Sequence, residues 1–154
     1  MGLLGAVTLV DKWEGYSATT YRDVVGVPTI CRGHTGPLAA KGHASVAECD
    51  AATLADIRVA AATVDRCAPG LPNGPRNAWT SFTYNTGPGR AGVKDGFCVL
   101  KSGAVPTHIK LIRQGRHAEA CEMLLQWNKA GGKVLRGLTN RRVEELAMCL
   151  RGLE

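Results

Sequence analysis

Six cysteines are spread along almost the whole chain of 154 residues, at positions 31, 49, 67, 98, 121 and 149. None lie in a Cys-x-x-Cys pair, and the four histidines complete no zinc-ligand spacing, so we expect no metal or other cofactor. An even, dispersed set favours three disulfides and an oxidising compartment over the alternative of six buried free thiols. Six cysteines permit fifteen pairings, and spacing alone does not choose among them.

Length and composition indicate one globular domain. Apolar residues make up 45% of the chain, which is enough for a core of its own. Aromatic residues are sparse at 5% while there are 19 glycines, which favours closely packed helices joined by glycine-rich turns. The net charge of +6 attracts polyanions such as nucleic acid, anionic lipid or wall polymer. Because the basic residues are scattered, with no aromatic-interleaved basic strand, we expect no nucleic-acid partner.

The first half of the chain predicts a helix, a small sheet and a longer helix. Residues 3–13 favour a short helix, and the β-branched and turn residues over 16–36 predict an antiparallel sheet with tight turns. Ser45 and Glu48 have the spacing of a capping box, which begins a helix that ends near Cys67. One face of that helix is expected to carry Leu54, Ile57, Ala61 and Val64.

The second half is predicted to be helical. Pro75 suits the first turn of a helix ending near Tyr84, and Thr139 or Asn140 can cap the last helix. Between them we expect helices at 93–102, 106–114 and 117–128. The helix over 117–128 is expected to carry an apolar stripe of Ala118, Cys121, Leu124 and Leu125. The last helix of the chain is expected to carry one of Val143, Leu146, Ala147 and Leu150. The elements together predict an α+β fold, mainly α, with a β-containing lobe at about 14–45, a connecting helix at about 46–67 and a helical lobe at 68–154, in one domain over 1–154.

Glu14 and Asp23 flank a turn-rich stretch that closes with Gly-His-Thr-Gly. Paired carboxylates on opposite walls of a cleft can act as a general acid and as a group that holds water or stabilises a cation. Glu14 would lie at a helix end, where partial burial favours the protonated acid, and Asp23 in a polar hairpin, where exposure favours the anion. Thr29, on the neighbouring strand, offers a hydroxyl able to hold a water. Taken alone, such a pair is more often a solvated surface pair.

These three residues stand within E-G-Y-S-A-T-T-Y-R-D-V-V-G-V-P-T-I-C-R-G-H-T-G, which closely resembles the active-site segment of phage-type lysozymes, the endolysins of glycoside hydrolase family 24. The stretch A-W-T-S-F-T-Y-N-T-G (78–87) is similar to the family's central-helix segment. The stretch W-N-K-A-G-G-K-V-L-R-G-L (127–138), followed by Asn140-Arg-Arg and Glu144, is similar to its C-terminal signature. The resemblance covers nearly the whole chain and implies a phage-lysozyme-like fold. It also implies hydrolysis of the β-1,4 bond between N-acetylmuramic acid and N-acetylglucosamine in bacterial peptidoglycan, with lysis of the host cell.

Carried over by position, the resemblance implies that Glu14 is the general acid that protonates the glycosidic oxygen. It implies that Asp23 and Thr29 position the attacking water, and that Asp23 also stabilises positive charge at the anomeric carbon. A base and a water opposite the acid imply inversion, which needs carboxyls roughly 6.5–9.5 Å apart.

Four further residues are expected to bind the substrate or support the cleft: Asn85, Arg141, His34 and Tyr21. For His34 we favour a structural role, in which the hydrogen-bonded imidazole orients the hairpin. The alternative for Asn85 is a plain helix cap, and the alternative for Arg141 is a solvated surface position.

The cysteines are similar to those of endolysins that act in the periplasm, after export or release from the infected host cytoplasm. This resemblance and the inferred fold imply the pairs Cys31–Cys49, Cys67–Cys98 and Cys121–Cys149. Residues 1–10 are apolar and uncharged but too short to span a membrane, which needs about twenty residues. They resemble the end of a signal-anchor-release segment, and otherwise favour an amphipathic first helix. We therefore expect a monomer that associates transiently with the membrane through this segment.

Two other functions stay open. A lytic transglycosylase cleaves the same bond with one Glu and leaves an anhydro sugar, but Asp23 and Thr29 beside Glu14 favour water as the nucleophile. A non-enzymatic cationic protein could bind the wall or disrupt anionic membranes by charge alone. Killing that persists without Glu14 would support that second function.

Overall fold

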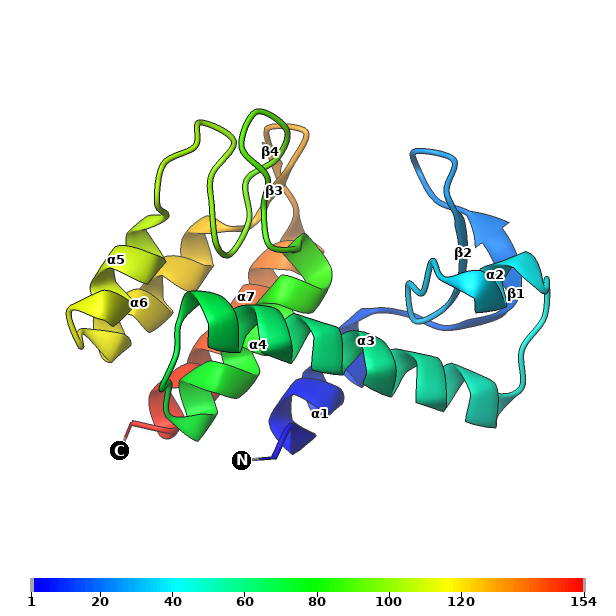
Figure 1. Cartoon of the computed structure of the whole chain (residues 1–154), viewed down its shortest axis with the longest axis horizontal. Coiled ribbons are helices and arrows are strands. Elements are labelled where there is room, and N and C mark those ends of the chain that lie inside the picture. Colours follow the sequence, from blue (N-terminus) through cyan, green and yellow to red (C-terminus); the bar gives the residue numbers. More distant parts are fainter. Residues whose placement is uncertain (1, 154) are drawn as a thin grey trace.

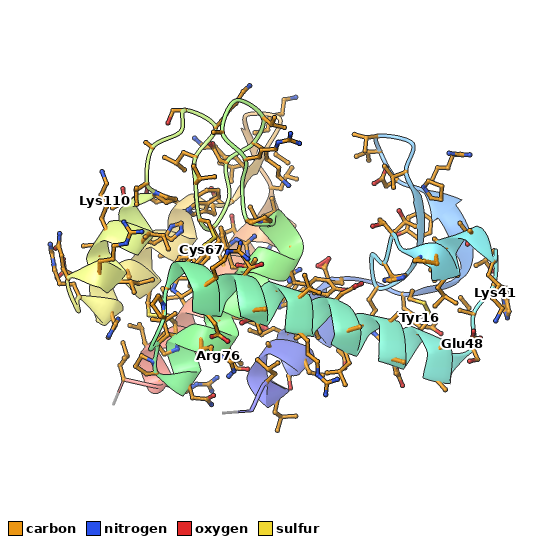
Figure 2. The ribbon with its side chains drawn as sticks, viewed as in Figure 1. Tyr16, Lys41, Glu48, Cys67, Arg76 and Lys110 are labelled. Atoms are coloured by element: carbon orange, nitrogen blue, oxygen red, sulfur yellow. A yellow bond between two sulfur atoms is a disulfide. The ribbon has the colours of Figure 1, made fainter. Side chains whose placement is uncertain are left out.

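The computed structural model describes residues 2–153, which form two lobes bridged by the long helix α3 (Val46–Cys67) (Figure 1). The capping box that begins α3 is formed as predicted: Ser45 Oγ accepts from the Glu48 amide at 3.1 Å, and Glu48 Oε1 accepts from the Ser45 amide at 3.1 Å. Glu48 lies beneath the β-containing lobe, whereas Cys67, at the other end of α3, lies in the helical lobe (Figure 2). The helix therefore sets the relative position of the two lobes.

One of the four residues predicted for the packing face of α3 is not buried. Ile57, Ala61 and Val64 are buried as expected, but Leu54 is exposed and Thr53 is buried in its place.

The β-containing lobe follows α1 (Leu4–Trp13) and is built on one antiparallel hairpin, as predicted. Strand β1 (Ser17–Arg22) pairs with β2 (Pro28–Cys31) so that Tyr21 faces Thr29. The short helix α2 (Pro37–Ala40) closes the lobe over its own small core, which consists of Ile30, Cys31, Ala39, Ala44 and Cys49.

The helical lobe is organised around α4 (Asn73–Thr86), which packs against α3, α1 and α7 (Arg136–Arg151). Helices α5 (Thr107–Arg113) and α6 (His117–Glu122) and the 3-10 helix η1 (Met123–Gln126) complete the lobe. Its core is aromatic: the rings of Trp79 and Phe82 meet edge to face with centroids 5.1 Å apart, a favoured aromatic geometry.

The three expected disulfides are all present. Cys31–Cys49 ties β2 to the first turn of α3, Cys67–Cys98 ties the end of α3 to the loop that follows α4, and Cys121–Cys149 joins α6 to α7. Each bond links elements that are distant in sequence, so the dispersed cysteines act as three cross-links within one fold.

The predicted helix over 93–102 is wrong, because this segment is part of an irregular loop between α4 and α5. Gly89 and Gly96 bring their backbones together so closely that a Cβ on Gly96 would lie 1.9 Å from the Gly89 nitrogen. The Phe97 amide donates to the Gly87 carbonyl at 3.0 Å, so the backbone hydrogen bonds here cross the loop. The apolar spacing of the segment thus reflects loop packing against the core.

The C-terminal predictions need three corrections. The helix over 117–128 is split into α6 and η1, with Cys121 and Leu124 buried but Ala118 and Leu125 exposed. The last helix begins at Arg136, before the predicted caps. The apolar stripe predicted for this helix is also wrong, because Val143 and Ala147 are exposed and Leu146 and Leu150 are only half-buried. The residues that the helix buries are instead Arg141, Arg142, Glu145 and Cys149. A small hairpin that the sequence did not predict, β3 (Lys129–Ala130) and β4 (Lys133–Val134), precedes that helix.

Helix α1 is amphipathic and lies on the same side of the molecule as the C-terminal end of α7 (Figure 1). Ala6 and Val10 are buried against Ile57 of α3, whereas Leu4 is exposed. The Ala6 amide donates to Asn77 Oδ1 of α4 at 2.9 Å, which anchors the helix to the core. Over residues 2–153, no helix is both long and apolar enough to cross a membrane.

Candidate active site

Glu14 occupies the C-cap of α1, where its amide donates to the Val10 carbonyl. Gly15 follows in the left-handed region, at φ +66°, and this conformation turns the chain from α1 into the hairpin. The Glu14 side chain is only 15% exposed, and its Oε2 accepts from Arg141 Nη1 at 2.5 Å. Its Oε1 faces the turn after β2, since a Cβ on Gly33 would lie 3.9 Å from it. Glu14 therefore lies between the helical lobe and the hairpin.

Arg141 is buried, not a solvated surface residue. Its Nη2 donates to the Ser81 carbonyl at 3.0 Å, and its Nε donates to Glu145 Oε2 at 3.3 Å. Glu145 is fully buried and also accepts from Ser81 Oγ at 2.6 Å and from Arg142 Nη1. A buried charge network thus begins at Glu14 and crosses the interface between α7 and α4.

Arg142 continues this network toward Asn85. Its Nη2 donates to Asn85 Oδ1 and to Thr86 Oγ1, and its Nε donates to the Trp127 carbonyl at 2.9 Å. Burial lowers the pKa of the Arg142 guanidinium, while the Glu145 and Glu14 carboxylates oppose that effect. The helix-cap alternative for Asn85 is wrong, because Asn85 lies inside α4, whose C-cap is Gly87, and its side chain accepts from an arginine of another helix.

Glu145, Arg142 and Ser81 also belong to this network, and the sequence did not predict them. The neighbouring Glu144, which is part of the segment similar to the family's C-terminal signature, lies on another side of α7 and binds Lys12 and the Trp13 indole. The available signal was the spacing of Glu145, three and four residues after the two arginines, which allows helical ion pairs to both.

Asp23 and Thr29 lie on the β1–β2 hairpin, with one polar group of each turned to the backbone. Asp23 Oδ1 accepts from the Val25 and Val27 amides, each at 2.9 Å, which fixes the turn. Thr29 Oγ1 donates to the Val27 carbonyl at 2.9 Å, so its lone pairs can accept from another donor. Asp23 Oδ2 has no hydrogen-bond partner within residues 2–153. Each side chain thus keeps an unoccupied acceptor, on a half-buried Asp23 and on a Thr29 that is only 4% exposed.

His34 and Tyr84 border a concavity of about 380 Å³ between the turn after β2, α3 and α4. His34 Nδ1 lies 2.7 Å from Asp56 Oδ2 of α3, which fits the expected structural role in holding the turn. The Tyr84 hydroxyl donates to the Arg32 carbonyl at 2.5 Å. Burial raises the pKa of Tyr84, and the negative charges of Asp56 and Glu14 raise it further. Thr83 also borders this concavity, with a buried hydroxyl that has no partner within residues 2–153.

Asn85 borders a second and larger concavity, of about 840 Å³, in the helical lobe. Trp127 and His108 form part of its wall, and Lys94 and Lys129 bring positive charge to it. Asn85 and His34 therefore border one concavity each, whereas Glu14, Asp23 and Thr29 line neither of these two. The Glu14–Arg141–Glu145–Arg142–Asn85 network ends at the larger one.

The structure brings some predicted residues together and leaves others apart. Glu14 contacts Arg141 directly and is linked through the buried network to Asn85. Asp23, Thr29 and the exposed Tyr21 share the hairpin, and within residues 2–153 no hydrogen bond joins this group to Glu14. Within residues 2–153, no group of three or more His, Cys, Asp or Glu side chains is placed so that it could hold a metal ion.

Comparisons with known proteins agree on one family. The family model for phage lysozyme matches residues 11–145. The chain is 36% identical over 153 residues to a SAR-endolysin of Pseudomonas phage phiKMV, an alignment that covers 96% of this chain and 85% of the relative. It is 35% identical over 144 residues to the SAR-endolysin of Enterobacteria phage PA-2, covering 92% of this chain and 80% of that protein.

Solved structures agree in fold. The active form of P1 phage endolysin Lyz matches with a TM-score of 0.82 at 23% identity, over 97% of this chain and 85% of that one. The secreted inactive form of the same endolysin matches with a TM-score of only 0.56, over 73% of each chain. The fold described here is therefore closer to the active form than to the inactive one.

Proposed function

The chain belongs to the phage lysozyme family of glycoside hydrolases, and we propose that it hydrolyses the β-1,4 bond between N-acetylmuramic acid and N-acetylglucosamine in peptidoglycan. The observation that carries the proposal is the carboxylate of Glu14, held at 2.5 Å by the buried Arg141 and facing the turn after the hairpin of Asp23 and Thr29. Peptidoglycan is the substrate that the phage lysozyme family implies.

Glu14 is proposed to act as the general acid. It transfers its proton to the glycosidic oxygen as the bond from that oxygen to the anomeric carbon breaks, so the leaving sugar departs as an alcohol. Positive charge then develops at the anomeric carbon. General acid catalysis of this kind contributes roughly 10²–10⁴-fold to the rate.

Asp23 and Thr29 are proposed to hold the water that replaces the leaving sugar. Thr29 Oγ1 already donates its proton to the Val27 carbonyl, so it can only accept a hydrogen bond from that water. Asp23 Oδ2 can accept the second hydrogen of the same water, because Oδ1 is occupied by two amides. With both hydrogens bound, a lone pair of the water oxygen is free to attack the anomeric carbon. Asp23 takes up the released proton, and attack from the side opposite Glu14 inverts the anomeric configuration.

Asn85 and His34 are proposed to contribute to glycan binding from the helical lobe and the turn after β2. Asn85 Oδ1 is occupied by Arg142, so the amide nitrogen is available to donate to an acetamido carbonyl. His34 borders the smaller concavity and holds its shape through Asp56. Tyr21 is exposed on the hairpin next to Thr29, where it could contact a sugar face.

We also propose that the protein acts in the periplasm as a monomer, after export or release from the infected cytoplasm. The three disulfides suit an oxidising compartment, and two relatives that the chain resembles are named SAR-endolysins. The exposed Leu4 on α1 offers an apolar contact for a transient membrane association. Flotation with anionic vesicles before and after Leu4→Ser would test that association.

The decisive experiment compares Glu14→Gln with Glu144→Gln, an equal change of charge in a surface carboxylate of α7. Glu14→Gln should keep the far-UV spectrum and abolish the clearing of a peptidoglycan suspension, whereas Glu144→Gln should clear it at a near-wild-type rate. Clearing by folded Glu14→Gln at a wild-type rate would refute the assignment. Cell killing by that variant without bond cleavage would favour the cationic, non-enzymatic alternative.

A further inference from the structure

Glu145 is a fully buried carboxylate that no step of the proposed reaction uses. Its two oxygens accept from Arg141, Arg142 and Ser81, so every partner lies on α7 or α4. A buried ion pair is often no more stabilising than apolar side chains of the same volume, because both charges lose their hydration. Stability alone therefore does not account for a glutamate and two arginines at this position.

The charges around Glu145 form a balanced set with Glu14. Arg141 is shared between the two carboxylates, since its Nη1 donates to Glu14 and its Nε to Glu145. Arg142 contributes a second guanidinium, paired with Glu145 and within electrostatic range of Glu14. Two cations and two anions cancel, and only Glu14 among the four side chains is not almost fully buried.

We propose that Glu145 is a positioning residue for the general acid, an inference that rests on the proposed function. It fixes Arg141 so that Nη1 points at Glu14, and its charge neutralises the second guanidinium. Without that charge, Glu14 would be the only counter-ion of two buried guanidiniums. Glu14 would then stay ionised down to lower pH, and an ionised Glu14 has no proton to give to the glycosidic oxygen.

Other groups also face Glu14, and they stay constant in the test. Tyr84 approaches from α4 and is neutral, since burial and nearby negative charge raise its pKa. The turn after β2 contributes the Gly33 backbone. Asp56 of α3, paired with His34, and Arg32 of the turn after β2 act electrostatically on Tyr84, with opposite signs.

A series of variants changes the net charge of the four-residue set in both directions. Glu145→Gln leaves the set at plus one, Arg142→Gln at minus one, and the double variant returns it to zero. Glu144→Gln, on another side of α7, serves as the matched control. For each protein, the pH at the midpoint of the alkaline limb of kcat/KM is measured, together with a ¹³C titration of the Glu14 carboxyl that needs no substrate.

We expect Glu145→Gln to move both midpoints down by about one pH unit, the effect of one buried charge on another across a guanidinium group. Arg142→Gln should move them up, and the double variant should return close to wild type. A merely structural role would lower kcat/KM without such a signed displacement. If Glu145→Gln does not fold, the comparison of Arg142→Gln with the double variant still isolates the Glu145 charge, because the first should be displaced upward and the second should lie close to wild type.

Two results separate the possible failures. Midpoints that are the same in all four variants would overturn the role of Glu145 while leaving Glu14 as the acid. Full activity of folded Glu14→Gln would overturn the proposed function, but the ¹³C titration would still report the electrostatic coupling.

Discussion

Removing the Cys121–Cys149 disulfide should destabilise the protein strongly and leave its activity intact. The bond closes a loop with a sequence separation of 28 residues. Loop-closure entropy for that length corresponds to about 3.6 kcal/mol of unfolding free energy. For a chain of this size, the loss would lower Tm by about 11 °C. Because both cysteines are fully buried, alanine is the better replacement, since a serine would bury an extra hydroxyl.

The Cys31–Cys49 bond provides a matched comparison. Its sequence separation of 18 residues predicts a similar cost, about 3.2 kcal/mol. However, Cys31 lies in β2 two residues after Thr29, so the loss of this bond should also loosen the hairpin that holds the water. We expect the activity of Cys31→Ala/Cys49→Ala to fall on the order of tenfold or more at a temperature where it is folded.

Thermal unfolding followed by circular dichroism, with turnover of soluble peptidoglycan fragments, measures both effects. Equal stability losses with unequal activity losses would support the reasoning. If Tm fell by less than ~3 °C in both variants, the loop-closure argument would fail. If the Cys121–Cys149 variant lost as much activity as the other, the special role of the hairpin bond would be wrong.

Three further predictions concern the core and the hairpin. Burial lowers the pKa of His108 from its ordinary value of 6.5 to about 4. Stability should therefore be fully present above pH 6.5 and fall by up to roughly 3 kcal/mol as pH drops from 6.5 to 4, a slope that His108→Gln should flatten in urea titrations. A double-mutant cycle of His34→Asn with Asp56→Asn should give a coupling of roughly 0.5–1 kcal/mol, and additive effects would mean that the pair does not hold the turn. Asp23→Asn should reduce kcat severely, and Thr29→Ala should reduce it to an intermediate extent. In the wild-type reaction, NMR should detect the inverted anomer of the product first. Early appearance of the retained anomer would exclude a direct attack by water.

Local sequence signals predicted the hairpin and the connecting helix. Ser45 and Glu48 cap α3 through bonds between residues three apart, so no distant contact is needed to form them. Strands β1 and β2 form the antiparallel hairpin that the β-branched and turn residues predict, and the structure adds the register in which Tyr21 faces Thr29. The disulfide pairing, in contrast, came from the resemblance, because it depends on how distant elements pack.

The last helix shows where apolar periodicity misleads. A pattern of Val143, Leu146 and Leu150 predicts an apolar packing face, but α4 covers the face with the arginines and Glu145. Charged residues at helical spacing usually form a solvated face. Only the tertiary contact with α4 makes these ion pairs buried, and a single sequence carries no signal for it.

The helix predicted over 93–102 is wrong for a different reason. Helical periodicity of a few apolar residues is weak evidence beside glycines that allow close backbone approach. Gly89 and Gly96 meet at a distance that no side chain could tolerate, and the Cys67–Cys98 bond fixes the loop to α3. The first constraint is a contact within the loop and the second is a bond to another element, so local apolar spacing reports neither of them.

Digestion of purified peptidoglycan in ¹⁸O-labelled water, followed by mass spectrometry of the muropeptides, tests most directly whether Glu14 catalyses hydrolysis. We predict that the wild-type protein releases reducing ends that carry one ¹⁸O atom each, and that Glu14→Gln releases almost none. Anhydro ends without label would contradict hydrolysis and indicate a transglycosylase. An undiminished yield of labelled ends from Glu14→Gln would contradict the role of Glu14 itself.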